Sequence, residues 1–457
     1  MRFCLECNSF MNCTHSQRIK ALHSGEPKDF ILLNGCEKQE RSHVPLVLPA
    51  AKPSPFKRGF HERFYEIQIF NNKFEKRFSM KQIAFLCTIC FLILAGCGAQ
   101  KQTEQIYSTD YRVINFHTHL RGYDPAKIMD VEQEVMNATD VDMVTNLNGF
   151  LMIDKEEDIN EHEKNFLKWI EVREQYPNVL IFVGIDYSKL KSPSARQALA
   201  ERLEWMYEQG ADGIKILKLL GMHHRDENGE LYRIDDPVFY DFFEKAGELG
   251  MPVLIHVADP PNYWKNDYYS SWDYPIPDSK QYHRNLNKLF VDIPSYDELI
   301  DQFKNVLRAH PKTNFVAAHM LNMSYQLNRL GEMFDEYPNL YVDTSARLRY
   351  LGRQTPYGVR DFFTKYQDRI LFGTDASVSS SFFNDEGEAI DEKIQQRKYF
   401  YGRHFAYFET DSFDIVEPYG YEESWLRLAG CQLPEEVLKK IYWDNAAKLA
   451  KRVAEMK

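Results

Sequence analysis

Five side chains that bind metal ions in many proteins stand at the ends of apolar stretches of this sequence. His117 and His119 close an apolar, β-branched segment, and side chains two apart on a strand point to the same face. His256, His319 and Asp375 each close a later apolar run. A lone strand-end histidine is usually a hydrogen-bonded core residue, but core packing would select Val, Ile or Leu at five such positions. Three imidazoles and one carboxylate suit a divalent cation such as zinc.

These residues belong to a regular alternation of strands and helices that begins at Tyr111. Helical stretches with apolar residues three and four apart, such as 159–176, 194–209 and 237–249, separate eight strand-like segments. This rhythm predicts an α/β fold, a (β/α)8 TIM barrel, whose strands converge with their C-terminal ends on one mouth. A doubly wound open sheet is the alternative, although no Gly-rich phosphate loop follows the first strand. The predicted strands are 112–120, 142–148, 179–186, 213–219, 252–258, 314–319, 340–344 and 369–374.

Two additions to the barrel are predicted. A long loop after the fifth strand, from Asp259 to about Asp297, is rich in Tyr and Trp. It is interpreted as a lid or pocket wall, or alternatively as a surface excursion that packs on itself. After the eighth strand, residues 377–457 are helical in character, and 434–440 with 441–453 are predicted to be closing helices over the barrel.

The strand-end residues give the chain a specific resemblance. It resembles the amidohydrolase superfamily and, within it, the amidohydrolase-related group of metal-dependent TIM-barrel hydrolases. The resemblance covers Tyr111 to the C-terminus. It implies that His117, His119, His256 and Asp375 ligate a single metal ion. It also implies that His319 contacts the water activated by that metal or a developing oxyanion. The motifs that carry it are Asn115-Phe116-His117-Thr118-His119, Gly213-Ile214-Lys215, Ile255-His256, Ala318-His319 and Phe372-Gly373-Thr374-Asp375.

Several further residues are candidates for contact with a substrate. Lys215 and Lys218 fall on opposite faces of the fourth strand, so one of them is expected to point inward. In binuclear relatives a lysine on this strand is carbamylated and bridges two metals; a substrate-facing or structural ammonium is the preferred interpretation here. Arg121 and Arg347 follow strand ends and could bind a substrate carboxylate, or equally pair with surface charges. His223-His224, just past the fourth strand, is interpreted as a solvated pair near the mouth.

The segment before the barrel carries a different signal. Met80-Lys81-Gln82 is followed by a short apolar run that closes with Leu94-Ala95-Gly96-Cys97, the order of charged, apolar and small residues typical of a secretory signal. The last four residues look like a bacterial lipobox, so 80–97 is predicted to be a lipoprotein signal with the lipid anchor on Cys97. Residues 98–110 are interpreted as a tether. Residues 1–79, Pro-rich in places and without periodicity, are predicted to be a disordered extension or a mis-assigned start.

Composition narrows the function classes. A formal net charge of -11 argues against nucleic acid as a partner. Cys431 is the sole cysteine of 111–457, which excludes a disulfide framework in the barrel. The sequence is compatible with three functions: metal-dependent hydrolysis of an ester, lactone or amide of a small molecule, non-oxidative decarboxylation, and binding without catalysis. The expected location is the bacterial cell envelope, and a homo-oligomer is left open.

Overall fold

The structure, a computed structural model, describes residues 106–150, 159–264, 292–379, 388–419 and 426–455. The chain divides into two compact units, Met1–Glu104 and Gln105–Lys457, and the described residues all belong to the second. The predicted extension 1–79, the signal segment 80–97 and the tether up to residue 105 therefore lie outside the described residues, as does most of the aromatic insertion. Within the described ranges, no helix is long and apolar enough to cross a membrane.

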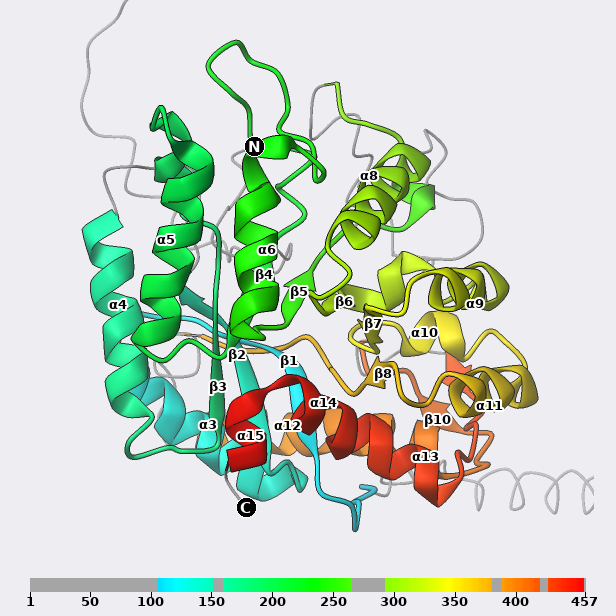
Figure 1. Ribbon diagram of the computed structural model, residues 1–457. Coiled ribbons are helices and arrows are strands. Elements are labelled where there is room, and N and C mark those ends of the chain that lie inside the picture. Colours follow the sequence, from blue (N-terminus) through cyan, green and yellow to red (C-terminus); the bar gives the residue numbers. More distant parts are fainter. Residues whose placement is uncertain (1–105, 151–158, 265–291, 380–387, 420–425, 456–457) are drawn as a thin grey trace, which may run out of the picture. The chain divides into compact units, whose positions relative to one another are not determined.

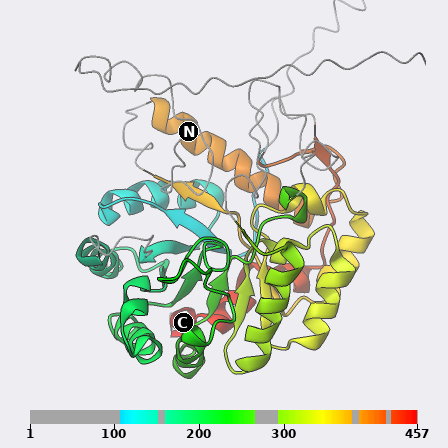
Figure 2. The ribbon, with the colours of Figure 1, turned by 90° about the horizontal axis from the view of Figure 1, so that it is seen from above.

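The described strands of the barrel form one sheet in which every pairing is parallel. Its order is β8-β7-β6-β5-β4-β3-β2-β1-β9, so each strand lies beside its neighbour in sequence until β9 pairs with β1. Figure 1 shows the strands surrounded by helices, and Figure 2 shows the same ring from above. The eight predicted strands and the TIM-barrel fold are confirmed; a ninth strand, β9, begins in the region after the eighth strand that was predicted to be helical. The strands are β1 Ile114–Leu120, β2 Met143–Phe150, β3 Val179–Val183, β4 Gly213–Ile216, β5 Val253–Ile255, β6 Phe315–Ala317, β7 Leu340–Asp343, β8 Ile370–Leu371 and β9 Ala376–Val378.

The barrel closes through two short strands, β8 and β9, that follow one another in the chain. β8 pairs with β7, and after a short irregular segment β9 pairs with β1. Two backbone bonds span the gap: Phe116 N–H donates to Phe372 O at 2.9 Å, and Asp375 N–H donates to His117 O at 2.9 Å. Gly373 is needed between them, since a Cβ there would lie 2.9 Å from the Cβ of His117.

At least one helix follows each strand, as a (β/α)8 fold requires. The predicted stretches at 159–176, 194–209 and 237–249 are confirmed, the last with a 3-10 turn at its start. α8 begins with a capping box in which Ser295 and Glu298 bond reciprocally, and α6 ends at Gly250 in a left-handed conformation. The helices are α3 Pro125–Thr139, α4 Ile159–Val172, α5 Ala195–Glu208, η5 Pro237–Phe239, α6 Tyr240–Leu249, α8 Tyr296–Ala309, α9 Leu327–Glu336, α10 Leu348–Leu351, α11 Pro356–Lys365 and α12 Glu388–Glu409.

Shorter elements complete the loops. A two-stranded antiparallel pair, β10 Ile415–Val416 with β11 Arg427–Leu428, lies beyond α12. Three one-turn segments follow strand ends: η4 Tyr187–Lys191, η6 Pro261–Trp264 and η8 Ala318–Asn322. Trp264, the described end of the aromatic insertion, donates from Nε1 to Pro294 O at 2.9 Å, so this part of the insertion packs against the start of α8.

Alternation along the strands sorts the core into two clusters. Val253 and Ile255 of β5 belong to the large cluster shared with the surrounding helices, whereas Leu254 belongs to a smaller one inside the barrel. The smaller cluster also contains residues of the predicted closing helices. Arg112, just before β1, lies over the Trp443 ring at 3.5 Å, and Lys451 Nζ donates to Leu249 O, just before β5, at 2.6 Å. These helices therefore cover the N-terminal end of the barrel, opposite the mouth. We call this cluster the barrel floor; it includes Ile114, Met143, Leu180, Leu254, Val316, Tyr341 and Leu371 with Ala446, Leu449, Ala450 and Val453.

The closing helices themselves run in short pieces. They are α13 Glu435–Lys439, the π-helical turn η10 Lys440–Asp444, α14 Asn445–Leu449 and α15 Lys451–Glu455. Phe372 N–H donates to Ile441 O at 2.8 Å, and Asn445 Nδ2 donates to Ile370 O at 2.7 Å. These bonds attach the closing helices to β8.

Candidate metal centre

β1 carries the two histidines of the first motif into the barrel through an irregularity in its pairing. The register of β1 against β2 shifts between Asn115 and Thr118. As a result two consecutive side chains face the interior: Phe116 packs edge-on against Phe182 at 5.4 Å, and His117 bonds to residues inside the mouth. A bulge of this kind re-aims a side chain at an active site.

Hydrogen bonds fix the tautomers of both imidazoles. His117 Nδ1 lies 2.7 Å from Asp343 Oδ2, and His119 Nδ1 lies 2.6 Å from Asn148 Oδ1. A carboxylate and an amide oxygen only accept, so each Nδ1 carries the ring proton. Each neutral ring therefore keeps a lone pair on Nε2. His117 Nε2 is buried without a hydrogen-bond partner among the described residues.

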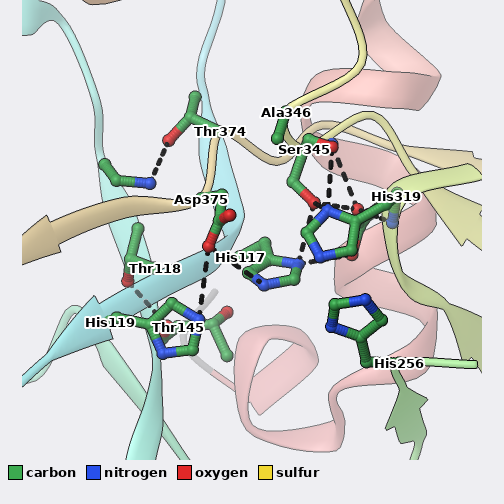
Figure 3. Close-up of polar contacts among 12 residues, drawn as sticks. His117, Thr118, His119, Thr145, His256, His319, Ser345, Ala346, Thr374 and Asp375 are labelled. Atoms are coloured by element: carbon green, nitrogen blue, oxygen red, sulfur yellow. Dashed lines mark hydrogen bonds and ion pairs between the residues drawn. The ribbon is translucent and has the colours of Figure 1, made fainter. Parts of the chain in front are cut away.

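Asp375 brings a third electron-pair donor to the same point. Its Oδ1 lies 3.3 Å from His119 Nε2 and 3.6 Å from His117 Nε2, and ligand atoms of the three residues lie within 4.8 Å of one another. Figure 3 shows the three side chains converging from β1 and from the segment after β8. Two nitrogen lone pairs and a carboxylate that face one another with no proton to share are held together best by a cation. The donor set fits a divalent metal such as zinc.

His319 stands on the other side of His117. The two ring centroids are 4.9 Å apart, and His319 Nδ1 lies 3.0 Å from Ser345 O. His117, His319 and Asp343 form a second group of potential ligands within 4.8 Å. Asp343 already holds His117 Nδ1 and accepts from the backbone N–H of His319 at 2.9 Å, so its carboxylate orients both rings.

His319 also opens a run of left-handed backbone. His319, Met320, Leu321 and Asn322 have φ of 58°, 52°, 53° and 54°. Such residues cost about 1–2 kcal/mol each unless the surroundings fix them. Here they are fixed: Tyr296 Oη donates to Leu321 O at 3.0 Å, and Asn322 Nδ2 donates to Ala258 O at 2.9 Å.

The structure places His256 beside these groups rather than within them. Its ring centroid is 4.4 Å from that of His319, yet it belongs to neither group of potential ligands. Its Nε2 is buried, lacks a hydrogen-bond partner among the described residues and lies 3.7 Å from Asp259 Oδ1. Asp259 is itself bound by Lys218 Nζ at 2.6 Å. His256 therefore faces the mouth, with a carboxylate near the nitrogen that would bind a metal.

Burial favours the neutral form of three imidazoles at the mouth, His119, His256 and His319. It lowers the pKa of His119 and of His256 to about 4 and that of His319 well below its usual value. For His119 burial outweighs the Asp375 carboxylate, which acts in the opposite direction. Neutral rings at pH 7 are the form that binds metal ions.

Lys215 is the inward-pointing lysine of β4, while Lys218 lies at the rim in its pair with Asp259. The Lys215 side chain is 1 % exposed, and its Nζ has no hydrogen-bond partner among the described residues. Burial lowers the pKa of Lys215 to about 8, and the carboxylates of Asp343 and Asp375 limit that fall. An unpaired buried ammonium beside the site is costly, so this position serves something other than packing.

The two candidate arginines have different surroundings. Arg347 is buried and donates from Nε to His319 O at 3.2 Å and from Nη1 to Ala346 O at 2.7 Å, while its Nη2 bonds to Asn322 Oδ1. These bonds tie the loops after β6 and β7 together, so its guanidinium is engaged with the protein. Arg121 directly follows β1, and its charge acts on His119.

His224 is also placed differently from the solvated pair that the sequence indicated. It is 5 % exposed and stacks on Tyr187 with 3.8 Å between ring centroids. Its neighbour His223 is half-buried.

Three residues that orient the histidines had no predicted role. Asp343 and Asn148 each lie at or near the C-terminal end of a predicted strand, the position that singled out His256, His319 and Asp375. Applying the strand-end rule to all polar residues would have found both. Ser345 lies just past β7, one residue beyond the predicted strand 340–344, and bonds through Oγ to Asp343.

Three comparisons with known proteins were informative about the family of the chain. A family model described as Amidohydrolase matches residues 181–451. Among solved structures, 2,6-dihydroxybenzoate decarboxylase from Rhizobium is 14% identical, with 75% of this chain and 99% of that chain covered and a TM-score of 0.44. Dihydroxybenzoic acid decarboxylase from Polaromonas, solved with bound manganese and 2-nitroresorcinol, is also 14% identical. The match covers 75% of this chain and 97% of that chain, with a TM-score of 0.44. 4-Oxalomesaconate hydratase from Rhodopseudomonas palustris is 15% identical, with 75% of this chain and 97% of that chain covered and a TM-score of 0.41. No curated protein matches the chain.

Proposed function

Because the chain belongs to the amidohydrolase family, we propose that it is a metal-dependent hydrolase acting on an ester, lactone or amide of a small molecule. The observation that carries the proposal is the convergence of His117 Nε2, His119 Nε2 and the Asp375 carboxylate within 4.8 Å. His256, whose ring centroid is 4.4 Å from that of His319, is proposed as the fourth ligand, and this role requires its ring to move toward that point. When bound there, a divalent ion, in our proposal Zn²⁺, would polarise a substrate carbonyl and acidify water.

The residues of the chain then divide the proton transfers among them. Asp375 carries a carboxylate at the convergence point, close enough to take a proton from the attacking water and return it to the leaving group. Its backbone is fixed by the bond from its N–H to His117 O at 2.9 Å, so the carboxylate is held in place.

His319 has a narrower role than the family resemblance alone implied. Its Nδ1 faces the carbonyl oxygen of Ser345 and therefore carries the proton of the neutral ring. Nε2 is left with a lone pair, which accepts a hydrogen bond and cannot donate one to an oxyanion. We therefore assign His319 to orienting the attacking water.

Decarboxylation is the second candidate, and Lys215 is the observation that favours it. A buried ammonium without a hydrogen-bond partner in the described chain could hold the carboxylate of an acidic substrate near the convergence point. The same contact would also suit a hydrolase with an anionic substrate, so the reaction products decide between the two.

Metal analysis and product analysis test the proposal together. The purified full-length chain is expected to contain about one equivalent of divalent metal and to lose turnover with a chelator. Assays on a panel of lactones, esters, amides and aromatic carboxylic acids should show acid release without carbon dioxide. Carbon dioxide release would favour the second candidate, and a metal-free protein that is inert across the panel would favour binding without catalysis.

The envelope location is proposed on sequence grounds. The lipobox Leu94-Ala95-Gly96-Cys97 supports a lipid anchor on Cys97, with the barrel tethered at the outer face of a bacterial membrane.

A further inference from the structure

A half-buried tyrosine from outside the barrel contacts two of the loops that form the mouth. Tyr419 follows β10, and its hydroxyl donates to the carbonyl oxygen of Thr374, the residue before Asp375. The same hydroxyl accepts the backbone N–H of Ala346 at 2.8 Å, the residue after Ser345. One phenol oxygen thus joins the loop after β7 to the loop after β8.

Both loops need such support, because each has a left-handed residue at the contact. Ala346 has a φ of 53° and Asp375 a φ of 61°, and neither is glycine. Non-glycine residues persist in this conformation only where surrounding contacts over-determine it. Tyr419 bonds to one of these residues directly and to the other through the preceding carbonyl group.

Tyr419 is itself held rigidly. Its ring meets those of Phe400 and His404 edge-on, at 5.2 Å and 5.5 Å between centroids, and both residues lie on α12. Two residues earlier, the fully buried Glu417 pairs with Arg349 Nε of α10 at 3.3 Å. The segment 415–419 is therefore anchored to the wall of the barrel on two sides.

From these contacts we infer that Tyr419 is a positioning residue for the metal centre, acting through the backbone of Thr374 and Ala346. We call Tyr419 and these two contacts the rim clamp. Asp375 lies at the convergence point, and the loop after β7 supplies Ser345, which bonds to Asp343. The rim clamp thus sets the distance between the carboxylate that would bind metal and the loop that orients His117. The inference rests on the proposed metal site. Tyr419 was not among the site residues predicted from the sequence.

The test compares Tyr419→Phe with a matched loss of a buried phenol elsewhere. Tyr442 is fully buried, and its hydroxyl donates to Glu409 Oε1 at 3.1 Å, outside the metal centre, so Tyr442→Phe removes a similar hydrogen bond. Zinc affinity of the full-length variants is measured by chelator competition. Cobalt(II) is then substituted and its visible spectrum recorded. Tyr419→Phe should weaken zinc binding about 10-fold and alter the cobalt spectrum, as loss of a supporting contact does at other metal sites. Tyr442→Phe should leave both unchanged.

Hydrogen exchange supplies a readout that needs no metal. In the metal-free protein, Tyr419→Phe removes the acceptor of the Ala346 amide, and exchange in peptides covering 344–348 should accelerate about 10-fold or more. Unchanged exchange there, or zinc affinity equal to that of Tyr442→Phe, would overturn the rim clamp. A wild-type chain that binds no metal would instead refute the proposed function, and the exchange measurement would still decide whether the clamp exists.

Discussion

Replacing Asp343 with Asn should impair metal binding more than any effect on folding would explain. Asp343 Oδ2 accepts the proton of His117 Nδ1 at 2.7 Å, while Oδ1 accepts the backbone N–H groups of His319 at 2.9 Å and Ser345 at 3.0 Å. Asparagine has one acceptor oxygen in place of the two carboxylate oxygens. Either the His117 ring or the two backbone donors must then meet an amide –NH₂.

The backbone donors are fixed, so the amide nitrogen is expected to face His117. The ring then has to accept at Nδ1 and to move its proton to Nε2, the atom that would bind the metal. Second contacts of this kind change metal affinity by roughly 10–100-fold, which corresponds to about 1.4–2.7 kcal/mol. Because the displaced proton falls on His117 Nε2, a proposed ligand atom itself, the upper half of that range is expected.

Chelator competition on the purified protein measures the affinity, and thermal unfolding of the metal-free form measures the change in stability. Asp212→Asn is the matched control, because Asp212 is a buried carboxylate that accepts from Ile181 N–H and Arg173 Nη1, each at 2.8 Å, away from the mouth. It should destabilise the fold and leave metal affinity unchanged. If Asp343→Asn bound zinc as tightly as the wild type, the tautomer argument would be wrong.

Four further predictions can be tested, three on the metal centre and one on the lipid anchor. Asp375→Asn should abolish turnover while the circular dichroism spectrum stays native; retained activity would reject its role in proton transfer. His119 and His256 have a pKa of about 4 in the folded protein, against an ordinary value of 6.5. The free energy of unfolding should therefore be unaffected by these rings above pH 6.5 and should fall as the pH is lowered toward 4. Urea titration of metal-free protein should show a loss of about 3 kcal/mol per ring over that window. Lys215→Met should stabilise the metal-free protein at pH 7 by about 3 kcal/mol, because the pKa of Lys215 falls from 10.5 to about 8, and should remove activity. Cys97→Ala should release the protein from the membrane fraction; persistence there would refute the lipid anchor.

The barrel and its strand-end residues could be predicted because their signals are local. Each strand is a short apolar run closed by a polar residue, and the pattern places His117, His119 and Asp375 at one rim whatever the detailed geometry. The prediction of the convergence therefore needed only the parallel order of the strands. Strand alternation likewise predicted that one of Lys215 and Lys218 points inward, and the structure shows that it is Lys215.

The strand-end rule would have marked Asp343 as a residue of the mouth, but the groups to which the supporting residues bond could not be predicted from the sequence. Asp343 is 226 residues from His117, and Tyr419 is 45 residues from Thr374. Arg347 shows the same limit from the other side: as a lone arginine after a strand it suggested substrate binding, whereas the structure uses its guanidinium to join loops. The register shift in β1 is also invisible in a sequence that alternates regularly.

The barrel floor has a consequence for how the chain is made. All nine described strands of the barrel sheet leave the ribosome before Ala446, Leu449 and Val453, the residues that pack with Ile114, Leu254, Val316, Leu371 and their neighbours. Until those helices are synthesised, the lower interior of the nascent barrel stays open to water and to chaperones. A product terminated a few turns early would thus keep an apolar opening at its base, and quality-control proteases should remove it even though its metal-binding rim is complete.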